Sequence, residues 1–166
     1  QRRRFGVFWR LGYCFRPIVH DQGQFCHQHT CGMVDYPAHL ISLRHFRPSE
    51  FRAYDRMAPD FLAFLDAVRD TAGVPFRLTS DWRSPAANAG ASGSSPTSLH
   101  LLGRAVDFTV PWTRETLWSV TMAVMLHAQT LTLGVELELV SGPTDRHIHL
   151  GVFPDGRPSR LVLSLT

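Results

Sequence analysis

Residues 98–107 read Ser-Leu-His-Leu-Leu-Gly-Arg-Ala-Val-Asp. From the arginine onward, small or polar residues alternate with apolar ones, which predicts a strand over 104–110 with Asp107 on the face of smaller residues. Gly103 permits a tight turn just before that strand. We therefore expect the side chains of His100 and Asp107 to converge on one point.

A second motif, His-Ile-His at residues 147–149, predicts the other half of a site. Alternate residues of a strand share a face, so His147 and His149 lie on the same side while Ile148 faces the core. Two histidines and one aspartate with a fourth position open form a catalytic rather than a structural zinc set. Zinc in such a site lowers the pKa of bound water toward ~7 and polarises a carbonyl, which suits amide hydrolysis.

The pattern outside these motifs predicts an α+β fold, a mostly antiparallel sheet with helices packed on one side. Glu136 and Glu138 lie on one face of a predicted strand, opposite its apolar residues, and read by themselves as a solvated pair. The expected elements are helices at 59–72 and 113–128, strands at 76–80, 104–110, 135–140, 147–153 and 160–165, and a loop over 81–98 rich in Gly, Ser and Pro.

The composition is that of one globular domain, with 166 residues, 44% of them hydrophobic and 19% charged. No apolar run reaches the ~20 residues that a membrane span requires, and we expect a soluble chain. All 17 basic residues are arginine, which excludes lysine-based chemistry. Because the net charge is only +3 and the only basic run is Arg2–Arg4, we expect no nucleic-acid partner.

The N-terminal stretch, residues 1–36, is rich in Arg, Gly, Cys and His and shows no clean period, so we interpret it as an irregular arm before the main domain at 37–166. Its cysteines are Cys14, Cys26 and Cys31. Three interpretations stay open: free or disulfide-paired structural cysteines, a second, structural zinc held by Cys26, Cys31 and neighbouring histidines, or a catalytic thiol.

Taken together, Ser-x-His-x-x-Gly-x-Ala-x-Asp and a late His-x-His resemble the zinc D-Ala-D-Ala carboxypeptidases and L-alanyl-D-glutamate endopeptidases that trim peptidoglycan, phage endolysins included. The hedgehog signalling domain shares this scaffold. The resemblance runs from about residue 45 to 153 and leaves out the N-terminal arm. It implies a hedgehog/D-Ala-D-Ala-peptidase-like fold and a peptidoglycan or peptide substrate, with action at the cell wall in a periplasmic, extracellular or phage-associated setting.

The same resemblance implies a role for each residue of the two motifs. It assigns one catalytic zinc to His100, Asp107 and His149. His147 then stays off the metal, where it stabilises the tetrahedral intermediate or transfers protons.

The resemblance also implies that Arg83 binds a substrate carboxylate, for which a bidentate guanidinium is suited. Ser98 either contacts the substrate backbone or caps its turn. Many relatives carry an acidic general base three positions before the last zinc ligand, whereas some rely on His alone, and Arg146 stands at that position in this chain. Asp145 and Glu138 are the candidate substitutes, and we favour His147 as the base with Asp145 as its partner.

Two other functions remain open from the sequence. A hedgehog-like module that holds zinc without hydrolysing anything is favoured by the arginine at position 146. The other open function is that of a protease with the same fold that acts on a protein substrate. The sequence predicts no oligomeric state.

Overall fold

The structure, a computed structural model, describes residues 42–91, 94–142 and 145–165. The elements along the chain are η2 (Pro48–Glu50), η3 (Tyr54–Arg56), α1 (Pro59–Ala72), β1 (Arg77–Ser80), α2 (Pro85–Ala89), η4 (Leu99–Leu102), β2 (Ala105–Thr109), α3 (Arg114–Leu131), β3 (Val135–Ser141), β4 (Arg146–Val152) and β5 (Arg160–Leu165), where η denotes a 3-10 helix.

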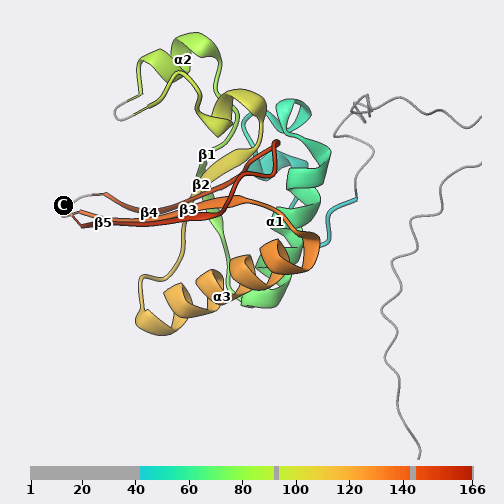
Figure 1. The fold of residues 1–166 in the computed structure, drawn as a ribbon, viewed down its shortest axis with the longest axis vertical. Coiled ribbons are helices and arrows are strands. Elements are labelled where there is room, and N and C mark those ends of the chain that lie inside the picture. Colours follow the sequence, from blue (N-terminus) through green and yellow to red (C-terminus); the bar gives the residue numbers. More distant parts are fainter. Residues whose placement is uncertain (1–41, 92–93, 143–144, 166) are drawn as a thin grey trace, which may run out of the picture. The chain divides into compact units, whose positions relative to one another are not determined.

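The five strands form one sheet in the order β1-β2-β4-β3-β5. Neighbours are antiparallel except β3 and β5, which run parallel. Figure 1 shows α2 and α3 on opposite sides of this sheet. The predicted α+β class, with a mostly antiparallel sheet, is confirmed.

The two faces of the sheet differ in character because the strands alternate. Val106, Phe108, Ile148 and Leu150 are fully buried and pack in one core with the apolar sides of α1 and α3. Within that core, Phe108 stacks on Phe76 with ring centroids 4.2 Å apart. The opposite face carries Asp107 and the histidines of β4, so the sheet separates the core from the candidate site.

The long helices follow their expected boundaries closely. Pro59 occupies the first turn of α1, and Gly73 ends it with a φ of 65°. Thr113 caps the start of α3, which runs past the expected residue 128 to Leu131. Within the described residues, no helix combines the length and apolar character required to cross a bilayer.

The segment 81–98, expected to be a loop, contains the short helix α2. Ser84 starts it by accepting a hydrogen bond from the backbone N–H of Ala87 at 3.2 Å, and Pro85 follows in the first turn. Because the segment is rich in Gly and Ser, the Ser-Pro pair that starts the helix does not stand out in the sequence. Five residues are also too few to show a helical period. The expectation of a loop over 81–98 was therefore wrong for Pro85–Ala89.

The turn at Gly103 joins η4 to β2 and packs closely against the backbone of Arg56 and Met57. Its φ is +65°, and a Cβ added there would lie 2.1 Å from the carbonyl oxygen of Arg56. The Gly103 carbonyl accepts a hydrogen bond from the N–H of Ala58 at 2.9 Å. This position therefore requires glycine both for its conformation and for space; the sequence predicts the tight turn, and the structure adds the close packing.

The predicted N-terminal arm, residues 1–36, lies outside the described residues. Its cysteines, and with them the predicted second zinc at Cys26 and Cys31, remain a prediction from the sequence.

Candidate metal centre

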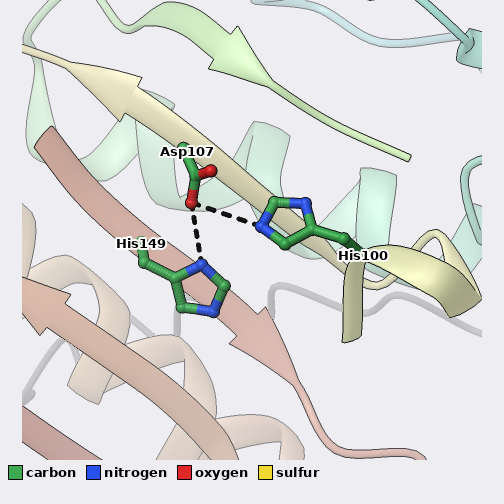
Figure 2. A group of neighbouring side chains, drawn as sticks. All are labelled: His100, Asp107 and His149. Carbon is green, nitrogen blue, oxygen red and sulfur yellow. Dashed lines mark hydrogen bonds and ion pairs between the residues drawn. The ribbon is translucent and has the colours of Figure 1, made fainter. Parts of the chain in front are cut away.

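Three side chains from three elements meet above the polar face of the sheet: His100 from η4, Asp107 from β2 and His149 from β4 (Figure 2). Each offers one ligand atom, and these atoms all lie within 4.8 Å of one another. His100 is 2% exposed and Asp107 is 9% exposed. The two sequence motifs therefore form one largely buried group that can hold a metal ion.

Asp107 stands at the centre of the group. Its Oδ1 lies 2.8 Å from Nδ1 of His149 and 3.3 Å from Nε2 of His100. The first contact follows from strand pairing, because Asp107 and His149 are direct partners in the antiparallel register of β2 and β4. The second follows from the Gly103 turn, which places η4 beside β2.

A backbone carbonyl orients His100. Its Nδ1 lies 2.6 Å from the carbonyl oxygen of Asp81. The carboxylate of Asp81 is itself buried and accepts the backbone N–H groups of Arg52 and Ala53. Because a carbonyl only accepts hydrogen bonds, it favours the tautomer of His100 with hydrogen on Nδ1 and a lone pair on Nε2.

The donor set fits a divalent cation. In the favoured tautomer the Nε2 lone pair of His100 faces the Asp107 carboxylate, and two acceptors at 3.3 Å repel unless a proton or a cation lies between them. Two imidazole nitrogens and one carboxylate oxygen are common zinc ligands. The group thus has the chemistry of a three-ligand zinc site.

When no metal is bound, protons on the histidines supply part of the positive charge that these facing acceptor atoms require. Burial by itself raises the pKa of Asp107, but hydrogen bonds from His100 and His149 outweigh it and hold the pKa of this carboxyl far below its usual range. Burial lowers the pKa of His149, yet hydrogen bonds to Asp107 and Glu136 raise it to about 9. The site is therefore strongly favourable for positive charge.

Arg83 directly contacts one member of this group, Asp107. Its Nη2 pairs with Oδ2 of Asp107, and its Nε donates to Ser80 Oγ at 2.9 Å. Among the described residues, Nη1 has no hydrogen-bond partner. Arg83 also lines a pocket of about 430 Å³ together with Arg52 and Trp82. The predicted carboxylate-binding residue thus contacts a candidate metal ligand and still faces a cavity.

The candidate proton-transfer residues lie on β4 and just before it. His147 shares the strand face of His149, and its Nδ1 lies 2.9 Å from Oδ1 of Asp145, whose side chain is 70% exposed. Glu138 is the direct partner of His149 in the register of β3 and β4, but its carboxylate accepts a hydrogen bond from the hydroxyl of Ser164.

Ser98 is the N-cap of η4, where its Oγ accepts a hydrogen bond from the backbone N–H of His100 at 3.4 Å. Of the two roles predicted for this serine, the structure describes the turn cap. Contact with substrate stays a prediction.

One residue beside the group was not among the sequence-based candidates. Glu136, expected to be solvated, is only 21% exposed, and its Oε2 lies 3.6 Å from Nε2 of His149. Its other oxygen lies 3.1 Å from Nη1 of Arg160. Strand alternation alone placed Glu136 on a polar face. Only the pairing of β3 with both β4 and β5 turns that face toward the site.

Comparison with known proteins identifies a family. Residues 32–150 match the sequence profile of Peptidase M15, a span that covers more than half of the chain and includes all three candidate ligands. Among solved structures, the crystal structure of the L-Ala D-Glu endopeptidase ChiX from Serratia marcescens is similar at 23% identity and a TM-score of 0.48, over 63% of this chain and 86% of that chain. No curated protein matches the chain.

Proposed function

Because the chain belongs to the Peptidase M15 family of metallopeptidases, we propose that it is a zinc-dependent peptidase that cleaves peptide bonds in peptidoglycan stem peptides or cross-links. The observation that carries this proposal is the convergence of His100, Asp107 and His149, whose ligand atoms lie within 4.8 Å of one another. In this proposal the protein acts at the cell wall, as a carboxypeptidase or an endopeptidase.

The three side chains supply two nitrogen ligands and one oxygen ligand, which leaves a coordination position open. Zinc bound there would supply an activated water and polarise the scissile carbonyl. Arg83 holds Oδ2 of Asp107 and so keeps Oδ1 turned toward the two histidines. The arginine thereby orients a ligand and also lines the pocket.

His147 is the proton-transfer residue in this proposal. The Asp145 carboxylate accepts a hydrogen bond from Nδ1 of His147, which leaves Nε2 of the same ring to take a proton from the attacking water and return it to the leaving amine. The pair replaces the acidic base whose position Arg146 occupies. Glu138 is the alternative base, since it lies opposite His149 on the neighbouring strand.

The pocket beside Arg83 accounts for substrate recognition. It is lined by two arginines, Arg52 and Arg83, together with Ser80 and Ser84. A carboxylate of a stem peptide that enters this pocket gains charge-assisted hydrogen bonds with Nη1 of Arg83. The substrate class proposed here is therefore a peptide with a free carboxylate close to the scissile bond.

The test is digestion of purified peptidoglycan, with the released fragments identified by mass spectrometry. We expect the wild type to release fragments, a chelator to stop the release and added zinc to restore it. His149→Ala should lose both zinc and activity. His147→Ala should keep zinc and lose about 10²-fold in turnover, because it removes one positioned proton-transfer group. His127→Ala, on α3 in contact with Thr71, is the matched control and should behave as wild type.

The same experiment decides between the alternatives. Wild-type protein that carries zinc but hydrolyses neither peptidoglycan nor peptides is the hedgehog-like zinc-holding module, which the arginine at position 146 favours. Wild-type protein that cleaves only proteins is a protease of the same fold. Loss of zinc in His147→Ala would make His147 a ligand and contradict its proposed role.

A further inference from the structure

We propose that Glu136 is a positioning residue that holds the His149 imidazole with Nδ1 toward the metal. The inference rests on the metal site of the proposed function and goes beyond it, because it names a carboxylate outside the ligand set as a determinant of metal affinity. The juxtaposition that carries it is the 3.6 Å approach of Glu136 Oε2 to Nε2 of His149, the ring nitrogen that points away from Asp107.

The strand register explains how Glu136 reaches this nitrogen. Its direct partner on β4 is Gly151, which has no side chain to separate the carboxylate from His149 two residues along the same face. The side chain of Leu99 packs against Gly151 on this face, since a Cβ on Gly151 would lie 2.6 Å from Leu99 Cδ1. Leu99 is buried, so the carboxylate lies partly shielded from water.

Arg160 holds the carboxylate from its other side. In the parallel register of β3 and β5, Arg160 is the direct partner of Glu136, and its Nη1 lies 3.1 Å from Oε1. One oxygen thus faces the arginine and the other faces His149. Glu138, two residues further along β3, accepts a hydrogen bond from the hydroxyl of Ser164, and its carboxylate makes no hydrogen bond or ion pair with His149 among the described residues.

The chemical consequence concerns the tautomer of His149. An anionic acceptor 3.6 Å from Nε2 favours the ring form with hydrogen on that nitrogen, so Glu136 leaves the lone pair of Nδ1 directed at the site. His100 has the equivalent arrangement, with the Asp81 carbonyl 2.6 Å from its non-coordinating nitrogen. Partners of this kind on metal-binding histidines fix the ring orientation and raise the basicity of the ligand.

The experiment measures zinc affinity of the full chain by competition with a chromophoric chelator, which requires no peptidase activity. We expect Glu136→Ala to weaken zinc binding by about 10- to 100-fold, the usual effect of removing such a partner. Glu136→Gln should lose less, because a neutral amide oxygen in the same place still presents an acceptor to Nε2 of His149. The control Glu50→Gln removes another arginine-paired carboxylate, 3.2 Å from Arg69 on α1, and should bind zinc as the wild type does.

The outcomes separate this inference from the proposed function. Wild-type affinity in Glu136→Ala overturns the role of Glu136 and leaves the metal site standing. If Glu136→Ala does not fold, wild-type affinity in Glu136→Gln overturns it instead. Failure of the wild type to bind zinc refutes the metal site itself. Thermal denaturation of the metal-free variants establishes that each is folded at the temperature of the zinc titration.

Discussion

Gly103→Ala is the substitution for which the structure makes the sharpest prediction. The residue has a φ of +65°, a conformation that costs an L-residue roughly 1–2 kcal/mol. A Cβ there also lies 2.1 Å from the Arg56 carbonyl oxygen and 2.9 Å from the Met57 Cα, both backbone atoms that no rotamer change can move. The turn must therefore shift, and with it the 2.9 Å hydrogen bond from Ala58 N–H to the Gly103 carbonyl.

The expected loss of stability is the sum of these effects. Overpacking adds about 1–3 kcal/mol and a weakened hydrogen bond adds up to ~1 kcal/mol, so Gly103→Ala should lower the free energy of unfolding by about 2–6 kcal/mol. Gly73→Ala is the matched control. Gly73 has the same φ of +65° at the end of α1, but a Cβ there meets no atom within 4 Å. It should cost only the conformational part, roughly 1–2 kcal/mol.

The assay is urea denaturation of both variants in the metal-free form, followed by zinc titration of the folded proteins. The turn carries His100 beside Asp107, so Gly103→Ala should also weaken zinc binding, whereas Gly73→Ala should not. Equal stability losses in the two variants would refute the argument from the Arg56 contact. If Gly103→Ala loses the expected free energy of unfolding but the folded variant binds zinc as tightly as the wild type, the claim that this turn positions the ligand His100 is refuted.

Three further predictions concern the core, the arginine and pH. Phe108→Ala should lower the free energy of unfolding by about 3–5 kcal/mol in urea denaturation, because Phe108 is fully buried. Arg83→Lys should reduce turnover more on free-acid peptides than on amidated ones, and equal losses would remove its role in carboxylate binding. Below pH 9, zinc affinity should fall as pH falls, because the pKa of His149 is raised to about 9 and its proton must leave before the metal binds. In the metal-free protein the same raised pKa stabilises the fold fully below the ordinary value of 6.5, and the contribution is lost as pH rises through about 9, so chelator competition and denaturation should show opposite trends.

The sequence by itself determined those features that depend on near neighbours along the chain. Alternation placed Asp107 on one face of its strand and Val106 on the other, and the same period of two placed His147 and His149 on one face of a later strand. Gly103 marked the turn because few other residues adopt a positive φ. The apolar stripe and flanking Pro and Gly predicted α1 with its observed bounds. Each of these signals lies within one element and its caps.

Only the tertiary structure decided which elements lie side by side. Arg83 turned out to pair with the candidate ligand Asp107, and Glu136 turned out to lie against His149 instead of in solvent. Both contacts depend on the strand order β1-β2-β4-β3-β5 and on its register, which packing of the whole core selects. A shift of one residue along β3 would move the carboxylate of Glu136 to the other face of the sheet without changing any local pattern. Periodicity carries no information about that register, and so the partners of the metal ligands cannot be identified until the chain is folded.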